Sequence, residues 1–264
     1  MGSYLDKNRN SWNKRAELHL NSEFYDVKSF LEGKSSLNSI ELKLLGDIQG
    51  KSVLHLQCHF GQDSISLSRM GAEVTGVDLS DKAIEIAQEI AQKDNSTAKF
   101  ICCDVYDLPN RLNEKFDIVF TSYGTIGWLP DLDKWAKVIS RFLKPNGQFV
   151  FVEFHPFVWM FDDNFDTIAY NYFKGQPIVE VKDSSYTDGK FSEKVEDVSW
   201  NHSLSEVVNS LIKNGLNINS LDEFDYSPYD IFTDSFEEGP GKFRVKKFGN
   251  KVPLVYSILA TKFD

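Results

Sequence analysis

One stretch, Val53–Leu79, constrains the fold more than any other part of the sequence. A short apolar run, Val53–Leu56, leads into a compact turn around Gly61, and a segment with helical spacing follows. A second apolar run, Glu73–Val77, then ends on Asp78. This order of strand, tight turn, helix and strand is typical of a βαβ unit, in which the turn meets a nucleotide and the carboxylate meets its ribose hydroxyls.

The same alternation continues to residue 154. Helical segments begin after good N-caps at Ser80 and Asp131, and short apolar runs lie between them. Regular alternation at this spacing predicts an α/β fold with a doubly wound parallel sheet. The expected strands are Ser52–Leu56, Glu73–Val77, Lys99–Cys102, Phe116–Phe120 and Gln148–Phe154, and the expected helix after the first strand is Gln62–Met70.

Residues 156–200 interrupt this rhythm. They contain many aromatic side chains and no clear amphipathic helix. We expect an inserted, aromatic-rich antiparallel β cap here, with a turn near Asp188-Gly189. The alternating runs that predict it are Thr167–Phe173, Pro177–Lys182 and Lys194–Trp200.

The end of the chain returns to the earlier pattern. Ser203 and Glu206 form a capping-box sequence that opens a helix, and strands are expected at Leu216–Phe224 and Pro253–Lys262. Helical spacing and the lack of any strand-like run predict a helical arm at the N-terminus. We expect a single domain over 1–264, made of this arm (1–50), a cofactor-binding core (51–155), the inserted cap (156–200) and the completion of the sheet (201–264).

Composition argues against several classes of protein. The net charge is −10 and no Lys/Arg-rich run exists, which disfavours nucleic-acid binding because phosphates require clustered cations. No apolar run reaches the roughly 18–20 residues of a membrane span. Cys58, Cys102 and Cys103 form neither a disulfide framework nor a CxxC pair, so the expected location is the reducing cytoplasm.

Five motifs in the correct order resemble those of the class I S-adenosylmethionine-dependent methyltransferases. They are the Val53–Gly61 turn, Asp78, Cys103-Asp104, the strand Phe116–Val119 and the Leu143–Gly147 segment. The resemblance covers residues 50–155 well and Ser203–Lys262 adequately. It implies a Rossmann-like doubly wound sheet of seven strands whose last strand is antiparallel, with S-adenosylmethionine as the cofactor.

The first motif departs from the family pattern. Relatives have an acid followed by three alternate glycines, where this chain has His55, Gln57, His59 and Gly61. The family acid helps to hold the methionyl ammonium of the cofactor. His55 can replace it only through a neutral ring nitrogen, and Gln57 can offer its amide oxygen.

The resemblance also implies roles for residues at the strand ends. Asp78 would accept hydrogen bonds from the ribose hydroxyls, and Asp104 from the adenine amino group. The alternative for Asp78 is a carboxylate that caps the next helix, but Ser80 already serves as that cap. The alternative for Asp104 is an ordinary acidic residue in a loop. The remaining predicted contacts are Gly61 at the closest approach of the chain, Leu79 and Val105 on the faces of the adenine, and Thr121 near the methionine end.

The fourth strand ends in Thr121-Ser122-Tyr123-Gly124, which lacks the Pro-Pro-aromatic motif of adenine and cytosine-N4 methylases. The chain also lacks a Pro-Cys pair for cytosine-C5 chemistry and the paired glutamates of arginine methyltransferases. Together with the acidic charge, these absences favour a small-molecule substrate.

Methyl transfer relies on positioning and water exclusion, a task that suits an aromatic cap. Tyr123 is a candidate for contact with the reacting groups, and His155 is the candidate general base, with a packed histidine as the alternative. A metal site built from Glu153, His155 and His202 is conceivable, but no ligand spacing requires one.

The favoured hypothesis is an S-adenosylmethionine-dependent methyltransferase that acts on the oxygen or nitrogen of a small molecule, as a monomer or homodimer. A non-catalytic S-adenosylmethionine-binding or regulatory protein is the first alternative, because the first motif is altered. An NAD-dependent oxidoreductase is the second, and the absence of GxGxxG weighs against it.

Overall fold

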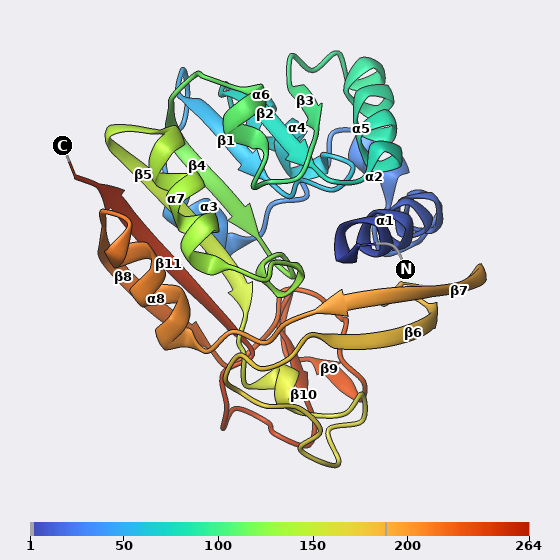
Figure 1. Cartoon of the computed structure of the whole chain (residues 1–264). Helices are drawn as coiled ribbons and strands as arrows, with labels where there is room; N and C mark the ends of the chain where they lie inside the picture. Colours follow the sequence, from blue (N-terminus) through green and yellow to red (C-terminus); the bar gives the residue numbers. More distant parts are fainter. Residues whose placement is uncertain (1–2, 188, 264) are drawn as a thin grey trace.

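A computed structural model describes residues 3–187 and 189–263 of the chain. Its main sheet contains β1 (Ser52–Leu56), β2 (Glu73–Asp78), β3 (Lys99–Cys102), β4 (Phe116–Ser122), β5 (Leu143–Phe154), β8 (Leu216–Phe224) and β11 (Val255–Lys262). The strand order is β3-β2-β1-β4-β5-β11-β8 (Figure 1). β11 pairs antiparallel with both of its neighbours, whereas the other pairs are parallel.

This arrangement confirms the predicted seven-stranded sheet with an antiparallel last strand. The predicted start of the fifth strand at Gln148 was wrong, because β5 begins at Leu143. Phe116 pairs with Leu143 and Ile118 with Gln148, so the residues between Leu143 and Gln148 bulge out of the ladder. Asn146 adopts a left-handed φ of 59° in this bulge.

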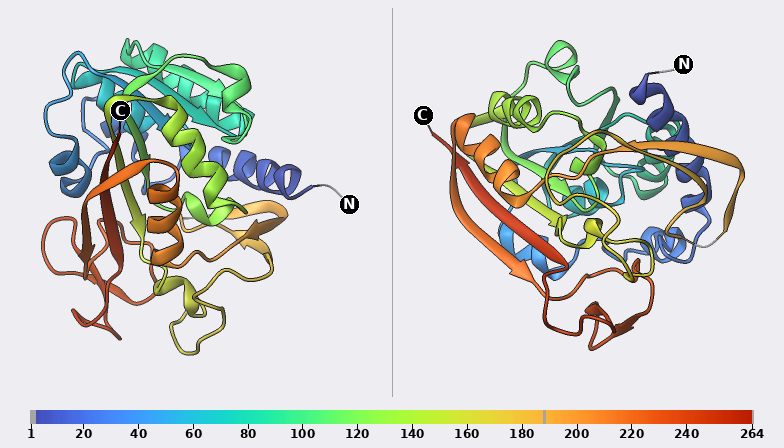
Figure 2. Two further views of the ribbon diagram at one scale, coloured as in Figure 1. Left: turned by 60° about the vertical axis from the view of Figure 1, so that its left-hand side comes forward. Right: turned by 60° about the horizontal axis from the view of Figure 1, so that its bottom comes forward.

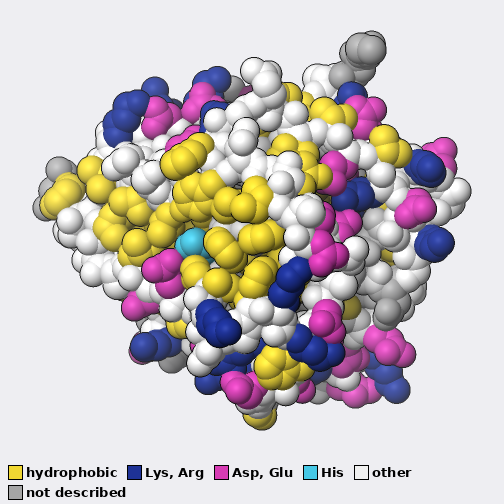
Figure 3. All heavy atoms as spheres, turned by 90° about the horizontal axis from the view of Figure 1, so that it is seen from below, with side chains coloured by type: hydrophobic (Ala, Val, Ile, Leu, Met, Phe, Trp, Pro, Cys, Tyr) yellow, Lys and Arg dark blue, Asp and Glu magenta, His cyan; other side chains and the backbone are white. Residues whose placement is uncertain are grey.

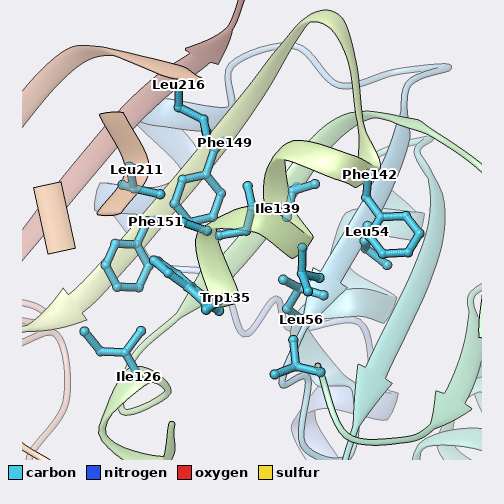
Figure 4. Close-up of a cluster of buried hydrophobic side chains, with 14 of the residues drawn as sticks. Leu54, Leu56, Ile126, Trp135, Ile139, Phe142, Phe149, Phe151, Leu211 and Leu216 are labelled. Carbon is cyan, nitrogen blue, oxygen red and sulfur yellow. The ribbon is translucent and has the colours of Figure 1, made fainter. Parts of the chain in front are cut away.

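Both faces of the sheet are covered by helices, because side chains alternate between two apolar faces along the central strands. Leu54 and Leu56 belong to the core beneath α7, together with the fully buried Trp135 (Figure 4). Val53 belongs to the core on the other face, with Leu45 and Leu67. The helices are α3 (Ser39–Leu45), α4 (Gln62–Arg69), α5 (Asp81–Asp94), α6 (Leu108–Arg111), α7 (Leu132–Phe142) and α8 (Leu204–Lys213).

The N-terminal arm begins with α1 (Tyr4–Leu20), in agreement with the helical spacing of this part of the chain. Ser3 and Asp6 form a capping box at its start. A short helix, α2 (Val27–Leu31), follows. Viewed as in Figure 1, α1 lies apart from the sheet, beside the far end of the cap hairpin.

The cap contains one antiparallel hairpin, β6 (Ile178–Ser184) with β7 (Lys190–Ser199). Its turn includes Asp188, which lies outside the described residues, so the predicted turn there is described only in part. The predicted strand at Thr167–Phe173 was wrong. Asp162 accepts hydrogen bonds from the backbone of Asp166 and Thr167 and from the Thr167 hydroxyl, and these local bonds hold a turn instead.

The loop after β8 carries a second small hairpin, β9 (Ser235–Glu237) with β10 (Phe243–Val245), where no strand was expected. Figure 2 shows it beyond the end of the main sheet, next to the cap. Aromatic rings from both segments pack into one cluster that includes Phe157, Phe165 and Phe248. The face seen in Figure 3 carries a broad group of hydrophobic side chains with charged ones at its margin.

Within the described ranges, no helix combines the length and the apolar character needed to cross a membrane.

Candidate functional site

The carboxyl ends of β1, β2 and β4 open into a cavity of about 870 Å³, a size suited to a cofactor and a small substrate. Arg15 of α1 and Tyr186 of the cap hairpin lie in its wall. Of the residues predicted from the sequence, Thr121 and His155 do not line it. Those that line it are His55, Gln57, Gly61, Asp78, Leu79, Asp104, Val105 and Tyr123.

In the turn after β1, every second residue has a left-handed backbone conformation: Gln57, His59 and Gly61. The His59 N–H donates to Asp78 Oδ2 at 2.8 Å, which ties the turn to the end of β2. A Cβ atom on Gly61 would lie 2.5 Å from the ring of Phe100 on β3. Packing against Phe100 therefore requires the glycine at position 61, whatever ligand binds beside it.

Asp78 ends β2 with both carboxylate oxygens engaged by backbone. Oδ1 accepts from Ser80 N–H at 2.9 Å and Oδ2 from His59 N–H. Burial raises the pKa of Asp78 to about 6 although these bonds lower it. The helix α5 is capped by Ser80, whose Oγ accepts from Ala83 N–H at 2.9 Å. The Asp78 side chain is thus not the N-cap, and its remaining acceptor capacity can serve a ligand.

Asp104 stands at the corresponding place after β3. It accepts one backbone bond, from Tyr106 N–H at 3.1 Å, and it lies in the cavity wall with Leu79 and Val105. Burial raises its pKa above the ordinary value. One carboxylate with a single backbone bond, between two apolar side chains, can accept from the amino group of a flat heterocycle.

Gln57 carries a buried acceptor with no partner. Its Nε2 donates to Thr125 O at 2.8 Å, and because a carbonyl can only accept, this contact fixes the amide orientation. Oε1 then has no hydrogen-bond partner among the described residues. A buried amide oxygen without a donor costs free energy, so this position suits a ligand N–H such as an ammonium group.

His55 lies in the wall but is neutral. Its Nδ1 is 2.8 Å from Ser64 Oγ, its ring packs on Phe120, and burial lowers its pKa to about 3. It therefore cannot supply the charge of the acid that relatives have at this position. Thr121 is fully buried, and its Oγ1 has no partner among the described residues.

Tyr123 follows β4 in a left-handed conformation, with φ of 42°, which is costly for a residue with a large side chain. Two bonds hold it there. The Tyr123 N–H donates to Val152 O at 2.7 Å, and the hydroxyl donates to Glu41 Oε2 at 2.8 Å. The phenol oxygen is thus committed to Glu41, and the ring is what Tyr123 offers to the cavity.

Glu153 anchors the loop after β4. Its carboxylate accepts from the backbone N–H groups of Gly124, Thr125 and Ile126 and from the Thr125 hydroxyl. Four donors to one buried carboxylate fix the same loop whose carbonyl orients Gln57. Glu153 therefore has a positioning role and does not support His155.

His155, the candidate general base, contacts Phe157 and Glu223, which do not line the cavity. Its Nδ1 accepts from Phe157 N–H at 3.1 Å, and its Nε2 lies 2.9 Å from Glu223 Oε1. Since it does not line the cavity, the structure gives the predicted base no access to a substrate there. His202 Nε2 donates to Leu129 O at 2.8 Å, a structural contact. Residues 3–187 and 189–263 contain no cluster of three or more side chains suited to a metal ion.

Sequence analysis did not identify Asp63 as a site residue. It lies in the first turn of α4, lines the cavity, and accepts hydrogen bonds from Ser36 Oγ at 2.6 Å and Ser122 Oγ at 3.2 Å. Burial, and then the nearby carboxylate of Glu41, raise its pKa to about 7. An acid in the first turn of a helix is common because of the helix dipole, so Asp63 has no specific signal in the sequence.

The second feature that was missed is a clasp between α1 and β7. Arg15 forms a buried two-point ion pair with Asp197, at 3.0 and 2.6 Å. The Asn8 amide exchanges two hydrogen bonds, of 2.8 and 2.9 Å, with the backbone of Val198. These contacts join the N-terminal arm to the cap across one side of the cavity.

Hydrogen bonds also connect the cofactor turn to the cap. His59 Nδ1 accepts from Phe60 N–H at 2.6 Å, so neutral His59 carries its proton on Nε2. This Nε2 lies 2.8 Å from His19 Nδ1, and His19 Nε2 lies 2.7 Å from Ser185 Oγ. Burial lowers the pKa of His59 to about 3 and that of His19 to about 2, so both rings are neutral and the tautomers follow from the Phe60 N–H.

Comparison with known proteins agrees with this geometry. Residues 53–147 match the model of a family described as "Methyltransferase domain". The chain is 30% identical over 118 residues to the ubiquinone biosynthesis O-methyltransferase of Coxiella burnetii (strain Dugway 5J108-111), covering 44% of this chain and 50% of that one. The corresponding enzyme of Bordetella avium is 26% identical over 132 residues, covering 48% of this chain and 54% of that one. The chain thus spans about half the length of the curated relatives it matches.

Solved structures show the same fold at lower identity. A Listeria monocytogenes protein assigned as an S-adenosylmethionine-dependent methyltransferase aligns with a TM-score of 0.59 and 22% identity, covering 85% of this chain and 96% of that one. A complex titled DhpI-SAH aligns with a TM-score of 0.56 and 17% identity, covering 98% and 97%. Residues 53–147 thus match a methyltransferase domain, and the chain has the fold of solved structures described as S-adenosylmethionine-dependent methyltransferases.

Proposed function

We propose that this chain transfers a methyl group from S-adenosylmethionine to the oxygen or nitrogen of a small molecule inside the cavity. One observation carries the proposal. Asp104, Asp78 and Gln57 lie at the carboxyl ends of β3, β2 and β1, which are consecutive in the sheet, and all three line the same cavity with acceptor capacity available. Ligands of doubly wound sheets bind at these carboxyl ends.

Each acceptor suits one part of the cofactor. Asp78 would accept from the ribose hydroxyls and Asp104 from the adenine amino group, with Leu79 and Val105 against the ring. The partnerless Oε1 of Gln57 would accept from the methionyl ammonium, the role that an acid has in relatives. The neutral side chain of His55 lies in the wall of the same cavity, and Gly61 keeps the turn compact.

When bound, the cofactor supplies a methyl group on a positively charged sulfur. The chain's contribution is to position the acceptor atom and to keep water away from it. The α1–β7 clasp closes one side of the cavity, and the ring of Tyr123 lies in its wall next to the end of β4. His155 has no part in this mechanism because it does not line the cavity.

A small molecule is supported as substrate by the enclosed cavity and by the net charge of −10, which opposes binding of a nucleic-acid backbone. The chain matches about half the length of the ubiquinone biosynthesis O-methyltransferases, whose name states that they methylate an oxygen. This likeness supports the general reaction rather than their particular substrate.

Calorimetric titration with S-adenosylhomocysteine and with NAD tests the proposal. We expect S-adenosylhomocysteine to bind and NAD not to bind. NAD binding without S-adenosylhomocysteine binding would refute the proposal and favour an oxidoreductase.

The altered first motif favours a second candidate function, a protein that binds S-adenosylmethionine without turnover. Incubation with methyl-labelled S-adenosylmethionine and a small-metabolite extract separates the two. Label in a new small molecule supports the enzyme, whereas binding without transfer supports the second candidate.

A further inference from the structure

The sheet order places Asp63 next to the expected methionine end of the cofactor. Along the edge, Asp104, Asp78 and Gln57 lie at the carboxyl ends of β3, β2 and β1, and β4 is next. Ser122, the last residue of β4, donates to Asp63 Oδ2 at 3.2 Å. Asp63 therefore lies one strand beyond the Gln57 amide, on the side of the cavity that the cofactor contacts leave open.

Four aromatic side chains line the same cavity as Asp63. Tyr25, Tyr123 and Tyr229 come from three separate segments, all line the cavity, and the charge of Asp63 contributes to the raised pKa of each. The Phe24 ring lies 5.0 Å from Tyr25 and 5.6 Å from Tyr229. Tyr229 meets Tyr123 edge to face at 5.0 Å. We call Asp63 with Phe24, Tyr25, Tyr123 and Tyr229 the Asp63 pocket.

The hydroxyl groups of these tyrosines already have partners. Tyr123 donates to Glu41, Tyr229 lies 2.8 Å from Asn38 Nδ2, and Tyr25 shares a 2.6 Å hydrogen bond with Tyr186. The pocket thus offers ring surface and one carboxylate, with few free hydrogen-bonding groups. Such a lining suits a cation with an apolar periphery better than a polyhydroxyl group.

No cation of the protein neutralises Asp63. Its two side-chain donors are the hydroxyls of Ser36 and Ser122, and no described Lys, Arg or His forms an ion pair with it. The three cationic Lys and Arg side chains in the cavity wall are each paired with another acid: Arg15 with Asp197, Lys34 with Asp26 and Lys182 with Glu180. A half-buried carboxylate in this state is costly until a cation joins it.

We propose that the Asp63 pocket binds an organic ammonium group, and that the methyl acceptor is therefore an alkylamine. The inference rests on the proposed methyltransferase function and specifies its substrate class. An N–H proton of the bound ammonium passes to the Asp63 carboxylate, and the freed nitrogen lone pair forms the new N–C bond. The electron pair of the broken C–S bond stays on sulfur, and the methylated ammonium carries the positive charge away.

Paired ligands of the same shape test this inference in the full chain saturated with S-adenosylhomocysteine. Choline is the cationic probe, and 3,3-dimethyl-1-butanol is its neutral isostere. By calorimetry at pH 8 we expect choline to bind at least tenfold more tightly. In Asp63→Asn this preference should fall to within about twofold, while S-adenosylhomocysteine affinity stays unchanged.

The matched control is Asp163→Asn, which removes the same charge from an exposed position in the cavity wall. We expect it to keep the choline preference, so a general charge effect is distinguished from a specific contact. Equal binding of the two probes to the wild-type protein would overturn the inference, and so would an undiminished preference in Asp63→Asn. Failure of S-adenosylhomocysteine to bind would instead refute the proposed function.

The pH dependence gives a readout that does not need the variant to fold. The ionised form of Asp63 binds a cation, so choline affinity should rise from pH 6 to pH 8. The other groups that face Asp63 are Glu41 from α3 and the phenols of Tyr25, Tyr123 and Tyr229, which stay uncharged in this range. The variant Glu41→Gln shows how much of the change in choline affinity is due to Glu41. A choline affinity that does not change between pH 6 and pH 8 in either wild type or Glu41→Gln would contradict the inference.

Discussion

The two sides of the cavity are built in different ways. On the proposed cofactor side, Asp78 is the last residue of β2, and Gln57 and Asp104 lie within two residues of the ends of β1 and β3. A hydrogen bond from His59 N–H to Asp78 joins the turn to the strand end within one βαβ unit. On the proposed substrate side, Asp63 shares the cavity with aromatic rings from distant segments, and the wall is closed by contacts between α1 and β7. The first side depends on local chain order, whereas the second depends on long-range pairs.

The largest expected effect tests the long-range side. Arg15→Ala leaves Asp197 buried and unpaired, so we expect the free energy of unfolding to fall by about 3–5 kcal/mol, measured by chemical denaturation. Lys14→Ala is the control in the same clasp. Its partner Glu193 is largely exposed, so the loss should stay below about 1 kcal/mol. Equal losses in the two variants would show that the clasp is not held by the buried pair.

The next effect tests the local side. Asp78→Ala removes the expected charge-assisted bonds to the ribose, so S-adenosylhomocysteine affinity should weaken by roughly 2 kcal/mol or more in calorimetry. Asp81→Ala, three residues further on and outside the cavity wall, should leave the affinity unchanged. Unchanged binding in Asp78→Ala would remove the central residue of the cofactor site.

A pH series compares the half-buried Asp63 with its neutral isostere, Asp63→Asn, without any ligand. The pKa of Asp63 is raised in the folded chain, so between pH 4 and 7 the folded state keeps a proton that the unfolded state has lost, and stability falls as pH rises. Asp63→Asn lacks this loss. After allowance for partial solvent screening, we expect it to be more stable than wild type by on the order of 1–2 kcal/mol above pH 7.

This stability gap should close towards pH 4, as measured by urea denaturation across the series. His19, His55 and His59 have lowered pKa values in the folded chain, so their protonation in the unfolded state reduces the stability of both proteins below about pH 6.5. This reduction is the same in wild type and Asp63→Asn and cancels in the difference. Asp163→Asn should show no such gap. A stability difference that does not change with pH would mean that the pKa of Asp63 is not raised in the folded chain.

The smallest effect concerns the link between the two sides. Ser185→Ala removes the acceptor for His19 Nε2–H and should cost about 1 kcal/mol of stability, with little change in S-adenosylhomocysteine affinity. Thermal denaturation with and without S-adenosylhomocysteine measures both quantities. A large loss of cofactor affinity would show that the cap and the cofactor turn are coupled more strongly than a single bond allows.

These differences explain how much the sequence could predict. Strand ends such as Leu56 and Cys102 were placed correctly because apolar runs and turn residues are local signals. The same signals located Asp78 and Asp104 in the cavity. Arg15 and Asp197 could not be paired from the sequence, because an ion pair between distant segments leaves no period or spacing.

Two further errors have physical causes of the same kind. His155 follows β5 as predicted, but its N–H donates to the carbonyl of Leu254, the residue before β11, and its ring lies against Glu223 of β8, a residue distant in the sequence. The alternating aromatics of Thr167–Phe173 look like a strand, but side-chain bonds from Asp162 satisfy the local backbone first. Periodicity reports which side chains can be buried and does not report which partner buries them.

The clasp has a consequence for synthesis of the chain. Arg15 leaves the ribosome 182 residues before Asp197, which at typical elongation rates corresponds to about 10–35 s. During that time Ala16 of α1 can already pack on α5, whereas Arg15 has no acidic partner from the cap. The cavity wall is therefore completed late, after the cap hairpin emerges, and a chaperone that shields α1 in the interval would favour correct closure.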